Sequence, residues 1–196
     1  QECFVKVLNK ILTRKITDIV RGDIEGVQKC LSKSDGQLIA RDRVMDGIMK
    51  GGQCAIQFDY KNAFGTISRI EIIRRLMHYK IESNIINYIV DLFNKQRIIY
   101  KIKDEYKEMS IETGVPQGEP LSMVLFSLGI DALVQKYNAI DGVHVTAYAD
   151  DILIVFDKLE NVKRVKGEFE RDAKEIGLTL NRAKTKIAFL TDVDER

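Results

Sequence analysis

Two apolar segments joined by a very short acidic connection constrain the fold of this chain more than any other feature. The segments cover residues 143–148 and 152–156, and only Ala149, Asp150 and Asp151 stand between them. A connection this short predicts two strands that fold back on each other as an antiparallel hairpin. Asp is common in turns, so a polar turn is one explanation of the acid pair. Between apolar strands, however, two adjacent like charges are unfavourable unless a cation or hydrogen-bond donors neutralise them.

A third carboxylate follows another apolar strand. Asp59 comes directly after the segment 54–58, an ordinary position for an acid when taken alone. If the two core strands pair, Asp59, Asp150 and Asp151 meet at one point, and a few hard oxygen ligands with open positions suit Mg²⁺. Two ions about 3.5–4 Å apart can activate a 3′-hydroxyl and stabilise a pyrophosphate leaving group. We therefore expect the three carboxylates to lie within about 6 Å of one another.

The two prolines of the chain, Pro116 and Pro120, lie in a single loop with Gln117 and Gly118. Pro120 suits the first turn of the helix expected after it. Gly118 lets the backbone approach a ligand closely, and Gln117 offers both a donor and an acceptor to a base or sugar. On loop chemistry alone, a rigid loop that leads into the helix explains these residues better than a binding role does.

The rest of the chain alternates helical and strand patterns. Apolar residues at helical spacing predict helices over 1–21, 37–50, 68–78, 84–94, 121–137 and 162–176. Ser34 to Gly36 is expected as a turn, Ser68 with Glu71 fits a capping box, and Gly22 is expected to end the first helix. Alternation over 97–113 predicts a β-hairpin that turns near Asp104, and a last strand is expected at 186–189. The fold class is therefore α+β, with a small, largely antiparallel sheet covered by helices.

Helical spacing also predicts which faces are buried. In the first helix it selects Phe4, Val7, Leu8, Ile11, Leu12, Ile16, Ile19 and Val20. In the helix that begins at Ser68 it selects Ile70, Ile73, Leu76 and Met77.

Composition excludes several classes of protein. A hydrophobic share of 45% excludes a disordered chain, and a net charge of +2 excludes a polybasic nucleic-acid binder, so nucleic-acid binding requires a local surface. No apolar run approaches the ~18 residues of a membrane span and no leader opens the chain, so no membrane partner is expected. Cys3, Cys30 and Cys54 lack metal-ligand spacing and are expected to be reduced, mostly buried thiols of an intracellular protein.

Four segments, in this order, resemble the palm of a reverse transcriptase of the non-long-terminal-repeat (LINE-like) type. They are residues 58–67 (FDYKNAFGTI), 114–122 (GVPQGEPLS), 148–151 (YADD) and 177–186 (GLTLNRAKTK). Each segment alone is a weak signal, whereas the ordered set covers about two thirds of the chain and is specific. The resemblance implies a polymerase palm with partial helical fingers and no thumb. Residues 1–52 would be fingers helices, and 53–196 the palm, with a fingers-type insertion at about 68–113.

The resemblance also implies an activity and a metal site. The activity is RNA-directed DNA polymerisation, in which dNTPs are added to a DNA primer on an RNA template by two-metal nucleotidyl transfer. Asp59, Asp150 and Asp151 match the family's metal-binding carboxylates, with Mg²⁺ as the ion and Mn²⁺ as an alternative. A LINE-like element primes from nicked chromosomal DNA, which implies action in the nucleus. Only ten residues follow Lys186, so no thumb is expected.

Four further residues receive substrate-binding roles from the resemblance. Phe64 would pack against the sugar of the incoming nucleotide and exclude a 2′-hydroxyl, although core packing explains it too. Gln117 and Gly118 would contact the nucleotide and template. Lys184 would lie close to the triphosphate and protonate the leaving pyrophosphate, although a single cation at the start of a basic strand explains it equally well.

Some positions depart from the family pattern, and other readings stay open. Gly65, Glu119 and Met123 replace the residues usual at those positions, whereas all three aspartates are present. One alternative keeps the chemistry in a group II intron or retron-type reverse transcriptase. Another is a non-catalytic, nucleic-acid-binding remnant of a mobile element. A nucleotide-cyclase-like palm is more distant and leaves Gln117 unexplained.

Overall fold

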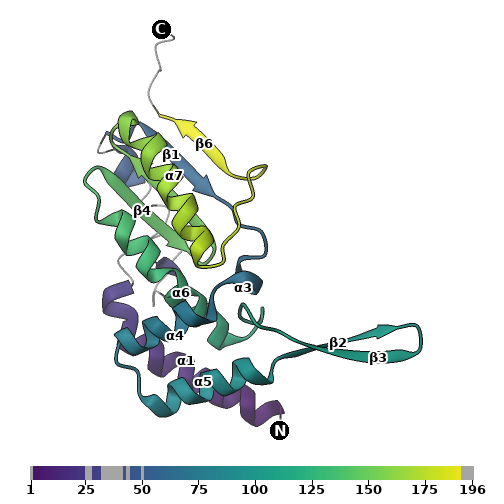
Figure 1. Ribbon diagram of the computed structural model, residues 1–196. Helices are drawn as coiled ribbons and strands as arrows, with labels where there is room; N and C mark the ends of the chain where they lie inside the picture. The colour runs from purple at the N-terminus through teal and green to yellow at the C-terminus, as the bar shows by residue number, and fades with distance from the viewer. Residues whose placement is uncertain (1, 25–27, 32–41, 43–44, 50, 191–196) are drawn as a thin grey trace.

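The computed structural model describes residues 2–24, 28–31, 42, 45–49 and 51–190. The turn expected at 34–36 and most of the helix expected over 37–50 lie outside the described residues. A four-stranded sheet with helices packed on it forms one end of the molecule, and further helices form the other (Figure 1). A two-stranded ribbon projects away from the helical end. The predicted α+β class is confirmed.

The sheet has the strand order β4-β5-β1-β6 and is antiparallel throughout. Its strands are β1 (Cys54–Phe58), β4 (Val143–Tyr148), β5 (Asp151–Phe156) and β6 (Lys186–Phe189), as the apolar patterns predicted. Successive residues of a strand point to opposite faces. Ile56, Phe58, Ile152 and Ile154 are buried, whereas Gln57 on the other face of β1 is exposed.

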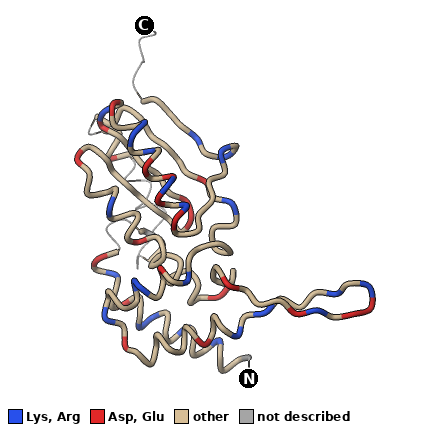
Figure 2. Tube along the Cα trace, in the orientation of Figure 1, with Lys and Arg blue, Asp and Glu red and all other residues tan. Residues whose placement is uncertain are grey.

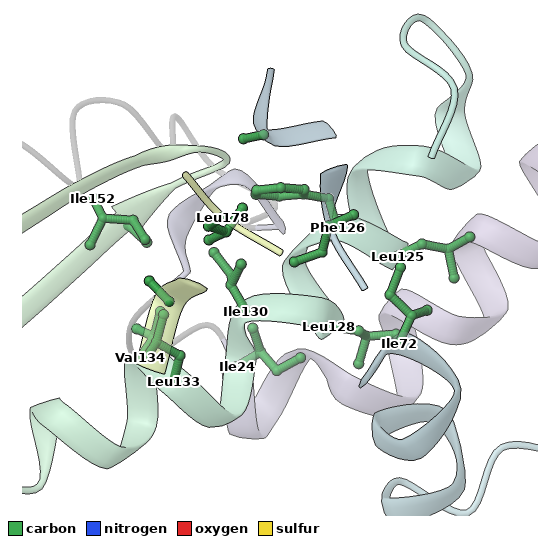
Figure 3. Packing of buried hydrophobic residues seen from close by; sticks show 14 of the residues in the cluster. Ile24, Ile72, Leu125, Phe126, Leu128, Ile130, Leu133, Val134, Ile152 and Leu178 are labelled. Carbon is green, nitrogen blue, oxygen red and sulfur yellow. The ribbon is translucent and has the colours of Figure 1, made fainter. Parts of the chain in front are cut away.

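Helix α6 (Pro120–Asn138) is the centre of the core, and most of its residues are buried. Its Tyr137 packs edge-on against Phe169 of α7 (Leu159–Glu175), and Phe169 in turn contacts Phe58 of β1. Side chains from α1 (Glu2–Ile24), α4 (Arg69–His78) and β5 pack around α6, together with Leu178 (Figure 3). Pro120 occupies the first turn of α6, as predicted. The loop before α6 is therefore mounted directly on the core.

Helix α1 (Glu2–Ile24) is longer than predicted, because it continues past Gly22. Its buried strip is Leu12, Ile16, Val20 and Ile24. The prediction of a wider buried face is wrong, because Phe4, Val7, Ile11 and Ile19 are exposed. Only one narrow side of α1 packs closely on α6, so these apolar residues of α1 remain on the surface.

Between β1 and α6 the chain forms three helices: α3 (Ala63–Thr66), α4 (Arg69–His78) and α5 (Ser83–Lys95). The Ser68 cap of α4 is confirmed, since its side chain accepts a hydrogen bond from the Glu71 backbone N–H. The Glu71 carboxylate pairs with Arg74 instead of returning to the cap.

The predicted buried face of α4 is wrong by a small rotation. Ile72 and Leu76 are buried, whereas Ile70 and Met77 are exposed. A buried ion pair between Arg75 and Asp131 of α6 sets this rotation. In α5, Ile85, Ile86, Ile89 and Phe93 are buried and Val90 is half-buried.

The projecting ribbon is the predicted hairpin, formed by β2 (Arg97–Ile102) and β3 (Glu105–Ser110). Lys103 has φ +54 in the turn beside Asp104, close to the position that the sequence predicted. Every residue of both strands is exposed. Lys and Arg alternate with Asp and Glu along the ribbon and the helices, in keeping with the near-neutral charge (Figure 2).

The three cysteines differ in their burial. All three cysteines are free thiols; Cys54 is buried and Cys30 half-buried, but Cys3 is exposed, so burial was predicted wrongly for Cys3. No helix within the described residues is long and apolar enough to cross a membrane.

Candidate active site

The acidic connection is a tighter turn than the sequence predicted. Tyr148 of β4 pairs directly with Asp151 of β5, which leaves only Ala149 and Asp150 as the loop. Ala149 has φ +54, a left-handed conformation that is unfavourable for a residue with a Cβ. Asp150 is half-buried at the end of the hairpin and Asp151 is exposed.

Strand register places Asp59 beside this hairpin. β1 and β5 are antiparallel and Phe58 pairs with Ile152, so Asp59, the first residue after β1, lies at the end of the sheet where Asp151 begins β5. Two distant segments of the sequence therefore bring their carboxylates to the same end of the sheet, as predicted.

The electrostatics of the three acids follow from this arrangement. The pKa of Asp151 is raised above its ordinary value, mainly by partial burial and then by the negative charges of Asp150 and Asp59. Within the described residues, none of the three forms an ion pair with a lysine or arginine. The closer approach expected for the three carboxylates is not confirmed, because no group of three or more His, Cys, Asp or Glu among the described residues could hold a metal ion as arranged here.

The raised pKa has a consequence for stability. At pH values between the ordinary pKa of Asp151 and its raised pKa, this carboxyl binds a proton more readily in the folded protein than in the unfolded chain. The free energy of unfolding therefore falls as the pH rises through that range. We expect Asp151→Asn to raise the Tm at pH 7 by up to about 2 °C, because exposure screens the repulsion that it removes. Thermal unfolding of both proteins from pH 4 to pH 8 measures this. A Tm below wild type at every pH would contradict it.

The loop of Gln117 is fixed to the segment that follows Asp59. The backbone N–H of Val115 donates to the Phe64 carbonyl at 2.7 Å, and that of Gly114 donates to the Ile67 carbonyl at 2.9 Å. The hydroxyl of Thr113 donates to the Gly65 carbonyl at 3.1 Å. Backbone hydrogen bonds therefore join residues 114–122 to residues 58–67, two of the segments that carry the resemblance.

Gly114 and Gly65 allow this close approach. Gly114 has φ +75, and a Cβ built on it would lie 2.4 Å from the backbone of Gly65. A Cβ on Gly65 would in turn meet the side chain of Asn62. The departure from the family pattern at Gly65 therefore fits the local packing.

Phe64 is half-buried, and its ring stacks on Phe126 of α6 with centroids 4.4 Å apart and an interplanar angle of 14°. Core packing against Phe126 therefore accounts for the buried part of the Phe64 side chain. Gln117 and Gly118 are exposed, and Gly118 has φ +87 with open space around it. Within the part of the chain that the structure describes, the Gln117 side chain has no hydrogen-bond partner, so it is free to bind a ligand.

Lys184 lies exposed in a turn whose backbone is tied to the end of β1. The Asn181 N–H donates to the Asp59 carbonyl at 2.8 Å, and the Asp59 N–H donates to the Thr185 hydroxyl at 3.4 Å. These hydrogen bonds bring residues 177–186, the last of the four segments that carry the resemblance, next to Asp59. Asn181 and Thr185 were missed as individual residues, although they lie inside the motif that singled out Lys184.

Arg69 was also missed. Its guanidinium donates to the carbonyls of Gly114 at 2.9 Å, Phe93 at 3.0 Å and Ile111 at 2.5 Å, and to the side chain of Gln96. It also lies over the Phe93 ring, 4.7 Å from its centroid. Arg69 thus joins α5 and the base of the ribbon to the loop of Gln117. No sequence signal distinguishes it from a solvated arginine at the start of a helix.

Comparison with known proteins gives relatives of one kind. The family described as "Reverse transcriptase (RNA-dependent DNA polymerase)" matches residues 1–193. The Pol polyprotein of the type-1 retrotransposable element R2 from Popillia japonica is 25% identical over an alignment of 169 residues, which covers 78% of this chain and 23% of that protein. Its counterpart from Bradysia coprophila is 26% identical over an alignment of 201 residues, gaps included, which covers 95% of this chain and 23% of that protein. The chain thus spans about a quarter of the length of these curated relatives.

Solved structures show a shared fold. Apo telomerase from Candida tropicalis superposes with a TM-score of 0.72 at 14% identity, over 94% of this chain and 37% of the telomerase chain. Telomerase from Candida albicans gives a TM-score of 0.65 at 14% identity, over 98% of this chain and 35% of that one. The α+β arrangement is that of a polymerase palm. With a family match over almost its whole length, and with relatives from R2 elements, the chain belongs to the reverse transcriptase family.

Proposed function

We propose that this chain is the palm and partial fingers of an RNA-directed DNA polymerase from a LINE-like retrotransposon. The observation that carries the proposal is the strand pairing that brings the residue after β1, Asp59, to the same end of the sheet as Asp150 and Asp151 of the hairpin. The loop of Gln117 and the ring of Phe64 are fixed next to the same segment. A carboxylate group flanked by a nucleotide-contacting loop is the arrangement that nucleotidyl transfer requires.

Asp59, Asp150 and Asp151 have the hard oxygen atoms that a divalent cation, Mg²⁺ or alternatively Mn²⁺, prefers, although the described residues do not group three such ligands into a metal site as arranged here. Partial burial, and then the negative charges of Asp150 and Asp59, raise the pKa of Asp151, and no described lysine or arginine pairs with the three acids, so a cation would relieve the repulsion between them. Asp59 and Asp150 would be the main ligands and Asp151 a supporting one. When bound, two such ions supply positive charge that lowers the pKa of the primer 3′-hydroxyl and stabilises the pyrophosphate that leaves.

The remaining residues would bind and orient the substrates. Phe64 would face the sugar of a dNTP, Gln117 and Gly118 would contact the nucleotide and the template base, and Lys184 would approach the triphosphate. An RNA template and a DNA primer are the proposed partners. One telomerase from Candida tropicalis was solved in complex with a fragment of telomeric RNA, which supports RNA as a partner of this fold. Action in the nucleus follows from the LINE-like proposal.

We also propose the domain division that the sequence suggested. Residues 1–52 and the insertion at about 68–113 would belong to the fingers, and the remainder to the palm. The helical end of the molecule, which contains α1, α4 and α5, supports this division (Figure 1). The exposed apolar residues of α1 are consistent with further fingers structure in a longer protein.

A primer-extension assay tests the function. The purified chain is mixed with a DNA primer on an RNA template, all four dNTPs and Mg²⁺, and extension should require the template. Duplex binding without extension under any metal would support the non-catalytic remnant. Activity on a nucleotide alone would support the cyclase-like reading.

Phe64→Val tests the sugar contact. A smaller side chain leaves room for a 2′-hydroxyl, so we expect the ratio of kcat/KM for dNTP over rNTP to fall by about 10- to 100-fold. Phe169→Val is the matched control, because Phe169 contacts Phe58 and Tyr137 in the core and should change stability but not the ratio. An unchanged ratio in Phe64→Val would mean that Phe64 serves packing on Phe126 alone.

A further inference from the structure

A buried glutamine far away in the sequence holds the turn that carries Asp150. Gln28 lies just before the short helix η1 (Lys29–Leu31) and is only 2% exposed. Its side-chain oxygen accepts a hydrogen bond from the Ala149 N–H at 2.9 Å, and its side-chain nitrogen donates to the Ala149 carbonyl at 3.2 Å. A single amide thus satisfies both backbone groups of one residue, 121 positions later in the chain.

The residue held in this way is the strained one. Ala149 has φ +54, and a residue with a Cβ persists in this conformation only where its surroundings enforce it. The loop has two residues, so the conformation of Ala149 determines the direction in which Asp150 leaves the turn. Without the Gln28 amide, the N–H and carbonyl of Ala149 would be buried without these partners, and the turn would relax to another conformation.

The segment that carries Gln28 is itself anchored. Gln28 forms a parallel backbone bridge with Ala147 at the end of β4. Two residues later, the sulfur of Cys30 lies 3.2 Å from the hydroxyl of Ser127 on α6. Because Gln28 is fixed to both β4 and α6, its amide is a rigid support for the turn.

We propose that Gln28 is a positioning residue, which presents Asp150 by holding Ala149 in its left-handed conformation. The catalytic part of this inference rests on the proposed polymerase function, whereas the structural part does not. Gln28 acts through Ala149 and does not touch substrate. Its loss should therefore lower kcat and leave the KM for dNTP nearly unchanged.

The test compares two glutamines with similar hydrogen bonds. Gln28→Met keeps the length of the side chain and removes both bonds to Ala149. Gln53→Met is the matched control, because the Gln53 side chain accepts a bond from the Leu159 N–H at 3.2 Å, away from the turn. We expect Gln28→Met to lower kcat by about 10- to 100-fold, with the KM for dNTP within about twofold of wild type. Gln53→Met should keep both values.

Amide hydrogen exchange gives a readout that does not need activity. In Gln28→Met the amides of Ala149 and Asp150 should exchange at least about tenfold faster, while those of β1 keep their rates. If wild type fails to extend primers but this local change is seen, the polymerase proposal fails and the support of the turn by Gln28 stands. A kcat equal to that of Gln53→Met in an active protein, or exchange that is faster across the whole sheet, would overturn the inference.

A second variant covers the case in which Gln28→Met folds poorly. Glycine adopts positive φ without the strain that alanine has. Ala149→Gly in the Gln28→Met background should therefore recover part of the lost kcat and of the local exchange protection. A glutamine that served only packing would not be rescued by a change at Ala149, and absence of any recovery would count against the positioning role.

Discussion

Asp150→Asn is expected to lower kcat for primer extension by at least about 10³-fold, which corresponds to about 4 kcal/mol of transition-state stabilisation. Asp150 would be a main ligand of the cations whose charge the reaction requires, and an amide provides one neutral oxygen in place of a carboxylate. The fold should survive, because the change removes one of three neighbouring negative charges. Single-turnover extension with Mg²⁺, together with thermal unfolding, measures both effects.

Asp157→Asn is the control for this experiment. Asp157 follows β5 at the opposite end of the strand, where its carboxylate lies 3.0 Å from His144. The same substitution there should leave kcat within about twofold of wild type. Extension by Asp150→Asn at more than a tenth of the wild-type rate would contradict the assignment of Asp150 as a main ligand.

Gly114→Ala is expected to destabilise the protein by about 3 kcal/mol or more, which lowers the Tm by roughly 6–12 °C. Two effects add at this position. The backbone has φ +75, and the new Cβ would lie 2.4 Å from the backbone of Gly65, which cannot move aside as a flexible side chain can. The hydrogen bonds of Gly114 and Val115 to the segment that carries Phe64 should break as well. Thermal or urea unfolding measures the loss.

Gly118→Ala separates strain from collision. Gly118 lies in the same loop with φ +87, but nothing lies within 4 Å of its added Cβ. The substitution at Gly118 therefore has only the cost of holding a residue with a Cβ at positive φ, about 1–2 kcal/mol. Equal losses in the two variants would mean that the backbone contact between Gly114 and Gly65 is not what stabilises the loop.

Features that depend on neighbouring residues were predicted well from the sequence. The hairpin of β4 and β5, the ribbon of β2 and β3, the Ser68 cap and the start of α6 at Pro120 follow from turn residues, alternation and capping, all of which are local. The position of Asp59 and Asp151 at the same end of the sheet was also predictable, because strand pairing limits where strand ends can lie, whereas the close approach expected for the three carboxylates is not confirmed.

Features that depend on which surfaces meet were predicted poorly or missed. The spacing in α1 and α4 allows more than one buried face, and packing on α6 selects a narrower or rotated one. Gln28 and Arg69 have no local pattern that marks them, because their partners lie at distant positions of the sequence. The strain at Ala149 likewise became visible only when the register of the hairpin was known.

The long-range contact of Gln28 with Ala149 has a consequence for how the chain becomes functional during synthesis. The segment with Gln28 leaves the ribosome early, and its amide has no turn to bind until 121 further residues have followed. The hairpin of β4 and β5 closes a two-residue loop and forms quickly, whereas pairing β1 with β5 closes a long loop at a higher entropic cost. The hairpin therefore forms as a local structure before Gln28 binds its turn and holds Ala149 in the left-handed conformation. We expect catalytic competence to be the last property that the folding chain acquires.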